Sequence, residues 1–444
     1  METELILRTG SQSSKTLIKG IITGVLILLM MIPTLFIMNL VSEREQRQKQ
    51  VAEEVSSKWA SSQTVSGPFL YIPYKYTAND AQGKPVLYTD KFWILPENLQ
   101  MSGQLEHQVR QRSIYKVLLY RTDIKGQGNI IIRIPENIDP QQVQWADARI
   151  CLGLTDFKGI EERILIKIGD KDIEMTPGLP GTEIDSTGLS APVDLSTADI
   201  GKTISFSTSL KLKGSEKLHF IPLAGNSSFA LQSTWPAPSF DGNSLPAERS
   251  VSDSGFSAKW VFNKANLPFG TVLNKAKFDP EALAFGVTMV QPADQYAKTE
   301  RAVKYAILVI GLTFSLFFIV EIMQKKPVHP VQYILIGLAL VIFYTLLLSI
   351  SEFIFFDIAY VIAAVATILL ITLYVKAHFG NWRAASIFSA VLTMLYGFIF
   401  VLVRLEDTAL LVGSIGLFLI LSIAMYASRN VDWYGTTDAR PDIN

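Results

Sequence analysis

Six long apolar runs constrain this chain more than any other feature of its sequence. One lies near the N-terminus and five lie in the C-terminal third, at residues 20–41, 306–323, 331–350, 354–375, 384–403 and 409–426. A helix needs roughly 20 mostly apolar residues to cross a bilayer, because the hydrocarbon core is about 30 Å thick. The pattern therefore predicts a membrane protein with six transmembrane α-helices.

The overall composition agrees with this class of protein. Of the 444 residues, 49% are hydrophobic and only 18% are charged, whereas roughly a quarter are charged in soluble proteins. Forty basic residues balance forty acidic ones, which disfavours a nucleic-acid partner because such proteins carry basic surfaces. Cys151 is the only cysteine, so the chain cannot form an intrachain disulfide or a site of several cysteine ligands.

The first apolar run is predicted to be an uncleaved anchor. It is longer than the core of a signal peptide, and no small-residue cleavage site follows it. In the charged stretch after it, Val51, Val55 and Trp59 recur every four residues, which is typical of an amphipathic helix. We interpret residues 42–60 as a helix that continues from the membrane; a coiled-coil dimerisation stem is the alternative.

Lysine and arginine in the short flanks predict how the six helices are oriented, because positively charged loops stay on the cytoplasmic side. With six crossings, the basic segments all fall on one side: Arg8, Lys15, Lys19, Lys325, Lys326, Lys376, Arg383, Arg429 and Arg440. The two intervening loops, SISEF and RLEDT, contain a single basic residue, Arg404. We therefore expect both termini in the cytoplasm and residues 42–300 outside.

The region between the first and second runs is predicted to be a β-rich, sandwich-like domain. Short alternating stretches such as FLYIPYKYT, PVLYTDKFWIL, KTISFSTSLKLKG and FSAKWVF are separated by turn signals such as QGKP, PENID and FDGNS. Many short strands with this spacing indicate an antiparallel sandwich or barrel. Residues 176–197, rich in Gly, Pro, Ser and Thr, are predicted to be a long loop or a junction between two β subdomains.

These features predict six consecutive regions in the chain. They are a cytoplasmic tail (1–19), the first transmembrane helix (20–41), a juxtamembrane amphipathic helix (42–60), a β-rich domain outside the membrane (61–300), a five-helix transmembrane domain (301–427) and a cytoplasmic C-terminal tail (428–444).

The sequence offers little catalytic chemistry. Two of its four histidines, His107 and His219, could meet in the β-rich domain, but no zinc-binding pattern surrounds them. The GQGN stretch at residues 126–129 lacks a third glycine and a following helix, so we predict a hairpin turn there and not a phosphate loop. We expect no enzyme activity, no metal and no cofactor.

Polar residues gather at the predicted outer ends of the C-terminal helices. They form a candidate outer-face polar cluster: Glu300, Arg301, Lys304, Glu352, Asp357, Arg404, Glu406 and Asp407. Charges near hydrocarbon are costly unless they neutralise one another. One interpretation is a salt-bridge collar that locks the helices and seats the outer domain; the other is a polar vestibule for a ligand, a proton or a lipid headgroup. Glu321, at the inner end, is expected to snorkel or to pair with Lys325.

Several linked phrases resemble the CreD family of bacterial inner-membrane proteins, also described as cell envelope integrity proteins. These phrases are SEREQRQKQVAEEVSSKWASSQTVSGPFLYIPY, GSEKLHFIPLAGNSSFALQSTWPAPSF, FGVTMVQPADQYAKTERAVKYAIL, HPVQYILIGLALVIFYTLLLSISE, LYGFIFVLVRLEDTALLVGS and VDWY. The resemblance implies a large periplasmic domain and a link to envelope integrity and to a two-component system. It carries over no catalytic residue, and the family commonly has glutamine or a similar polar residue in place of Arg404.

The expected function is that of a non-enzymatic protein of the bacterial inner membrane. It would support envelope integrity or the envelope stress response through its periplasmic domain. The expected partners are membrane lipids and other envelope proteins, and the sequence indicates no oligomeric state. The alternative is a transporter or a membrane-embedded enzyme acting on a lipid or cell-wall intermediate, which the charged residues at the helix ends would serve.

Overall fold

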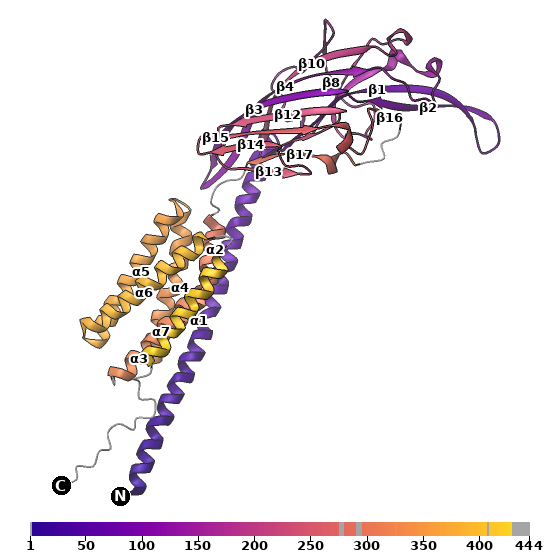
Figure 1. Cartoon of the computed structure of the whole chain (residues 1–444). Coiled ribbons are helices and arrows are strands. Elements are labelled where there is room, and N and C mark those ends of the chain that lie inside the picture. The colour runs from indigo at the N-terminus through magenta and orange to yellow at the C-terminus, as the bar shows by residue number, and fades with distance from the viewer. Residues whose placement is uncertain (1, 275–278, 290–294, 325, 406–407, 429–444) are drawn as a thin grey trace. The chain divides into compact units, whose positions relative to one another are not determined.

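The structure is a computed structural model that describes residues 2–274, 279–289, 295–324, 326–405 and 408–428. The chain divides into two compact units. We call Met1–Gln48 together with Ala293–Asn444 the helical unit, and Lys49–Pro292 the β unit. Figure 1 shows the elements of both units along the chain.

The chain begins with one long helix, α1 (Glu2–Trp59), which contributes to both units. Pro33 lies inside it without ending it. Proline is tolerated in a membrane helix because neighbouring groups satisfy the freed backbone carbonyl. The apolar run and the amphipathic stretch after it therefore form a single continuous helix.

The rest of the helical unit consists of α2 (Gln295–Lys304), α3 (Ala306–Gln324), α4 (Pro330–Ser351), α5 (Phe356–Phe379), α6 (Trp382–Arg404) and α7 (Ala409–Ser428). In the described part of the chain, five helical segments are long and apolar enough to span a membrane, and α7 contributes a shorter apolar stretch, Ala409–Ser422. The prediction of one N-terminal and five C-terminal membrane helices is confirmed.

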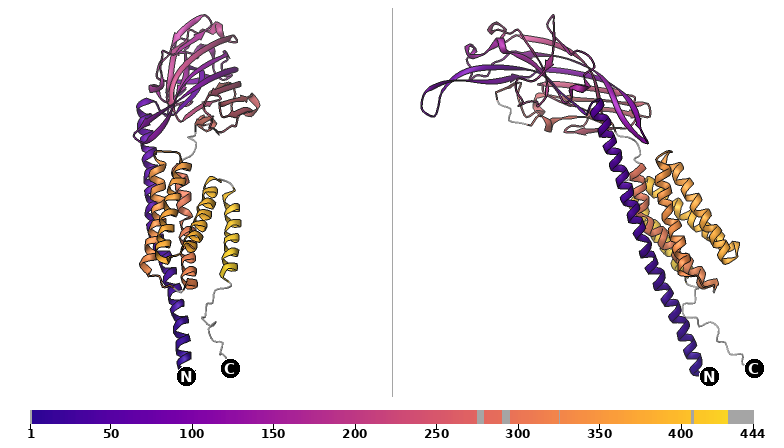
Figure 2. Two further views of the ribbon diagram at one scale, coloured as in Figure 1. Left: turned by 90° about the vertical axis from the view of Figure 1, so that its left-hand side faces the viewer. Right: turned by 180° about the vertical axis from the view of Figure 1, so that it is seen from behind.

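Local sequence signals set the ends of these helices. His329 caps the start of α4, where Pro330 occupies the first turn and needs no hydrogen-bond partner for a backbone N–H. Gly380 ends α5 in the left-handed conformation, φ 67°, which glycine adopts without steric cost. Asn381 then caps the start of α6 through the N–H of Arg383. The result is an antiparallel hairpin of α5 and α6 (Figure 2).

Aromatic rings and one close approach hold the helical unit together. The ring of Phe317 on α3 packs against the rings of Tyr333, Phe379 and Phe388, which belong to α4, α5 and α6. Gly337 on α4 faces Met30 on α1, and a Cβ atom added there would lie 2.6 Å from the Met30 sulfur. A small residue at position 337 therefore lets α1 pack closely on α4.

The β unit is built from two sheets. Within the described residues the first sheet has nine strands, in the order β13 (Pro238–Gly242), β17 (Phe285–Met289), β11 (Lys217–Ile221), β1 (Gln63–Asn79), β5 (Arg149–Leu154), β9 (Gly188–Pro192) and β8 (Thr176–Pro177), with β2 (Pro85–Ile94) and β16 (Val272–Leu273) off this path. The first residues of β1 pair in parallel with β11, and the rest of β1 forms a long antiparallel hairpin with β2.

The second sheet has eight strands in the described part of the chain. Their order is β14 (Glu248–Ser252), β15 (Gly255–Phe262), β12 (Asn226–Ser233), β3 (Asn98–Arg112), β4 (Tyr115–Ile131), β10 (Thr203–Ser215), β6 (Leu165–Ile168) and β7 (Lys171–Glu174). All neighbours are antiparallel except β12 and β3, which are parallel.

One hydrophobic core lies between the two sheets. Phe229 of the second sheet contacts Phe220 and Phe285 of the first, with ring centroids 5.3 and 5.0 Å apart. Along β3 and β10, buried and exposed residues alternate because successive side chains point to opposite faces. The predicted β-rich, sandwich-like domain after the first helix is confirmed.

Two local predictions were wrong. The GQGN stretch is not a hairpin turn, because it lies inside β4. Its glycines make room for packing: a Cβ atom on Gly128 would lie 2.7 Å from the Phe206 ring. The segment at residues 176–197 is not only a loop, since it contains β9 and the edge strand β8 of the first sheet. β3, whose inward side is made by Leu99, Met101, Gly103 and Leu105, was not predicted.

The C-terminal end of α1 is fixed within the β unit by polar contacts. Trp59 stacks against cations, with the Arg110 guanidinium 4.2 Å and the Lys213 ammonium 4.8 Å from its ring centroid. The backbone N–H and hydroxyl of Ser61, just after the helix, donate to Asp156 at 2.9 and 2.7 Å. These contacts determine where the first strand begins.

Glu97 organises several loops at one end of the sandwich. Its carboxylate accepts from Arg133 at 2.7 Å, Lys264 at 2.5 Å and Thr271 at 3.0 Å, and its side chain is 10% exposed. Burial by itself would raise the pKa of Glu97, but the hydrogen bonds from Lys264 and Thr271 and the nearby positive charges outweigh it and lower the pKa.

We expect Glu97→Gln to destabilise the protein at neutral pH but not in acid. A carboxyl whose pKa is lowered by folding contributes stability above its unfolded value of 4.5 and loses it as the pH falls through the folded value. Protonated glutamate resembles glutamine, so the two unfolding midpoints should converge as the pH falls below 4.5 and through the lowered folded pKa of Glu97. Thermal unfolding of the purified chain across pH measures this, and a constant difference down to pH 3 would contradict it.

Candidate functional site

The predicted polar cluster lies at one end of the helical unit, where it divides into separate contacts. Glu352, just after α4, has a side chain only 10% exposed. It accepts a hydrogen bond of 3.2 Å from the Tyr296 hydroxyl on α2, and the Arg44 Nε atom on α1 lies 3.9 Å away. Three helices thus meet around one carboxylate.

Asp357 and Arg404 form a second contact. Asp357 lies in the first turn of α5 and Arg404 is the last residue of α6. Their side chains form an ion pair, 42% and 52% exposed, and the Arg404 guanidinium also lies 4.6 Å from the Phe400 ring centroid. An exposed pair of this kind links the ends of two helices but contributes little to stability.

The third contact lies on α2. Lys304 pairs with Glu300 one turn earlier, at 2.9 Å. Arg301 donates to the backbone carbonyl of Val403 near the end of α6, at 3.4 Å. Glu406 and Asp407 lie outside the described residues.

The six described members therefore share one end of the helical unit but no common pocket. Glu352 is bound by groups from α1 and α2, Asp357 by α6, and Glu300 by its own helix. Contacts of this kind are those expected of a collar that joins helix ends. Whether any of these residues also has a functional role stays a prediction.

A buried carboxylate at the opposite end was not predicted correctly. Glu321 of α3 is 5% exposed and does not snorkel. It accepts from Lys19 of α1 at 2.5 Å, from the Val328 N–H at 2.9 Å and from the Tyr333 hydroxyl at 3.0 Å. Lys325, the expected partner, lies outside the described residues. The pairing with Lys19 spans 302 positions in sequence, so local spacing gave no sign of it.

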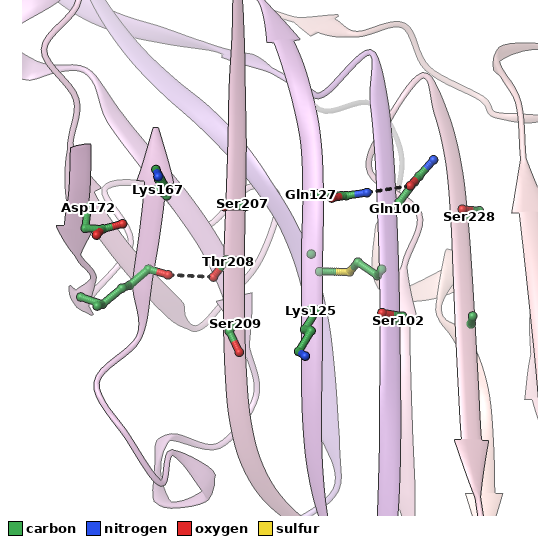
Figure 3. A pocket seen from close by; sticks show the side chains of 14 residues that line it. Gln100, Ser102, Lys125, Gln127, Lys167, Asp172, Ser207, Thr208, Ser209 and Ser228 are labelled. Carbon is green, nitrogen blue, oxygen red and sulfur yellow. Dashed lines mark hydrogen bonds between the residues drawn. The ribbon is translucent and has the colours of Figure 1, made fainter. Parts of the chain in front are cut away.

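The β unit contains a polar groove that the sequence did not reveal. The groove lies on the outward face of the second sheet, encloses about 640 Å³ and crosses six strands (Figure 3). The strand register aligns its residues in two rows. The first row is Ser228, Gln100, Gln127, Ser207, Lys167 and Asp172; the second is Ala230, Ser102, Lys125, Ser209 and Leu165.

Differences in side-chain size form this groove. Serines and an alanine contribute short side chains to its floor, while lysines and glutamines stand beside them (Figure 3). Gln127 donates to Gln100 at 2.9 Å across the strands, which holds both amides in place. Among the described residues, neither Lys125 nor Lys167 forms an ion pair with a carboxylate within 4 Å. The groove therefore presents hydroxyls, amides and two free ammonium groups.

The two histidines of the β unit do not meet. His107 lies on β3 of the second sheet, where its Nδ1 is 3.1 Å from the Thr234 hydroxyl. His219 lies on β11 of the first sheet, with its Nε2 2.8 Å from Asp241. Burial lowers the pKa of His219, although Asp241 opposes the shift. In the described part of the chain, no group of three His, Cys, Asp or Glu residues could hold a metal ion.

The fold and its polar contacts define a class: a polytopic membrane protein with a large β-rich domain inserted between its first helix and a C-terminal helical region. A match to the family described as Inner membrane protein CreD covers residues 15–434. Inner membrane protein CreD of Escherichia coli (strain K12) is 32% identical over 419 residues, 92% of this chain and 91% of that protein. The chain belongs to the CreD family, as the sequence resemblance indicated.

We expect the loss of Glu321 to destabilise the protein more than the loss of Asp357. Glu321→Ala should destabilise the protein by about 3 kcal/mol, because it leaves the Val328 N–H and the Tyr333 hydroxyl without their acceptor in a buried place. Asp357→Ala should cost less than about 1 kcal/mol, because the pair is exposed. Thermal unfolding of both variants in the same detergent tests this. Equal shifts of the unfolding midpoint would contradict the assignment.

Proposed function

We propose that this chain is a non-enzymatic inner-membrane protein that supports cell envelope integrity, or the response to envelope stress, through its β-rich domain. The polar groove of the second sheet carries the proposal, because it offers a large binding surface on the domain. Its hydroxyl, amide and ammonium groups suit an extended hydroxyl-rich envelope component that bears carboxylates, bound by hydrogen bonds and by Lys125 and Lys167.

The chemistry of the groove favours binding over catalysis. Catalysis by a nucleophile needs an activating base within hydrogen-bond reach. In the described lining no hydrogen bond joins a serine hydroxyl to a histidine or a lysine. Ser209 donates to the Asp123 carboxylate at 3.3 Å, a long bond, and the one carboxylate of the lining, Asp172, lies at the edge of the sheet on β7. Hydrogen-bonding groups spread over six strands instead suit a long partner.

The rival function is a transporter or an enzyme acting within the membrane. It would draw on the charged residues at the helix ends or on Glu321. The described contacts favour a structural role for them, since Glu321 accepts three hydrogen bonds and Glu352 is held by Tyr296 beside Arg44. A group already saturated by the protein is poorly placed to bind a substrate.

Filling the groove should abolish the function without unfolding the protein. Ser102→Trp and Ser209→Trp place large side chains on its floor, so we expect either variant to fail in restoring growth of a deletion strain under envelope stress. Ser250→Trp, on the edge strand β14 outside the groove, is the matched control. Abundance in the membrane is measured alongside growth, and full function of both groove variants at normal abundance would contradict the proposal.

Orientation is part of the same proposal. We place both termini in the cytoplasm and the β unit in the periplasm, because the basic flanks of the helices fall in alternate loops. The periplasmic side is also where a domain that contacts the cell envelope must lie.

Cysteine labelling tests this orientation cleanly, because the single native cysteine, Cys151, is buried and should not react. Gln82→Cys lies in the turn between β1 and β2, and Pro327→Cys lies between α3 and α4. A membrane-impermeant maleimide added to cells with a permeabilised outer membrane should label position 82 and not position 327. The reverse result would overturn the orientation.

A further inference from the structure

An apolar groove lies in the helical unit between α3, α6 and α7, and the proposed function does not use it. It encloses about 380 Å³, which falls within the roughly 300–1,000 Å³ of ligand pockets. Its walls are mainly apolar and include Leu308 and Leu312 of α3, Leu402 of α6 and Leu417 of α7. All three helices are predicted membrane spans, so the medium at this groove is lipid.

Glycines create the groove. A Cβ atom added to Gly311 of α3 would meet no atom within 4 Å, so the space beside this residue is open. Gly413 of α7 also lines the groove, and a Cβ atom there would touch only Leu402, at 3.7 Å. In water such a cavity would stay dry, but in a membrane an acyl chain can fill it.

A lysine lines the polar end of the groove. Lys304 and Tyr305 line the groove where α2 ends and α3 begins. Lys304 is 57% exposed and forms an ion pair with Glu300, and an ammonium group has three donors. Over its length α2 carries three cations, Lys298, Arg301 and Lys304, against one carboxylate, Glu300. α2 therefore brings a net positive charge beside the groove, and Lys304 is the cation that lines it.

The distance from Lys304 to the inner end of the groove matches the depth that a phospholipid acyl chain reaches in one leaflet. Lys304 and Leu312 are eight residues apart, which in a helix is roughly 12 Å. One leaflet of the hydrocarbon core is about 15 Å thick, half of about 30 Å. A lipid with its phosphate at Lys304 would thus reach the inner end of the groove with one acyl chain.

We propose that this groove is a binding site for an anionic phospholipid. One acyl chain lies between α3, α6 and α7, and the phosphate accepts hydrogen bonds from Lys304. The site is independent of the polar groove in the β unit, and it holds for either orientation of the protein in the membrane.

The acyl-chain arm of the test uses two matched substitutions. Gly311→Leu fills the groove, whereas Gly397→Leu adds the same bulk to an exposed position of α6 that also meets no atom within 4 Å. The full-length protein is purified in a mild detergent and titrated with phosphatidylglycerol, with binding followed by native mass spectrometry. We expect Gly311→Leu to lose one tightly bound lipid and Gly397→Leu to keep it.

A second substitution tests whether the site selects anionic lipids over lipids in general. Lys304→Gln should weaken phosphatidylglycerol binding about five-fold, because one lysine near a membrane surface contributes on the order of 1 kcal/mol. Phosphatidylcholine binding should change much less. If Gly311→Leu does not fold, Gly413→Leu replaces it, since that position tolerates a side chain. Unchanged lipid stoichiometry in the folded groove variant, or equal loss with both lipids for Lys304→Gln, would overturn the proposal.

Discussion

A backbone in hydrocarbon has no water to bond with, so each N–H and C=O group must be paired within the protein. This constraint shapes the helical unit. Its spans are continuous helices, and even Pro33 does not interrupt α1. Among the described residues of this unit, irregular backbone lies in the short connections, where His329 and Asn381 cap the starts of helices and Gly380 ends one. The chain can leave the helical conformation only where polar groups find other partners.

The same constraint determines where charge is placed. The charged residues described in the helical unit lie at or beyond the ends of the apolar runs, and the buried ones are bound on several sides. Glu352 joins α4 to α1 and α2, and Glu321 joins α3 to α1 and α4. α1 thus contributes a cation beside each end of its apolar run, Lys19 and Arg44. These two pairs help to hold a single N-terminal helix against helices that follow about 300 residues later.

The β unit is under a different constraint, because its two sheets share one core and the second sheet leaves its other face to solvent. The inward side chains of the two sheets form one core, rich in phenylalanine. The outward face of the second sheet is then released from packing and carries serines, glutamines and lysines in register. A groove can form there because short side chains in the middle of a face cost the core nothing.

The sequence by itself determined the class of protein. Runs of about 20 apolar residues have few other structures available, and alternation in KTISFSTSLKLKG or FSAKWVF is typical of a half-buried strand. Prediction failed where the sequence signal was weak or ambiguous. β3 was missed because most of its residues are polar, which hides the alternation of buried and exposed positions. The glycines of GQGN were assigned to a turn, but they allow close packing inside β4.

Only the tertiary structure showed which residues come together at the candidate sites. The pairing of Glu321 with Lys19, the two rows of the polar groove and the apolar space beside Gly311 each join residues from distant segments. Such contacts depend on strand register and helix packing, which side-chain periodicity does not encode. Periodicity shows which face of an element is buried, but not which other element covers it.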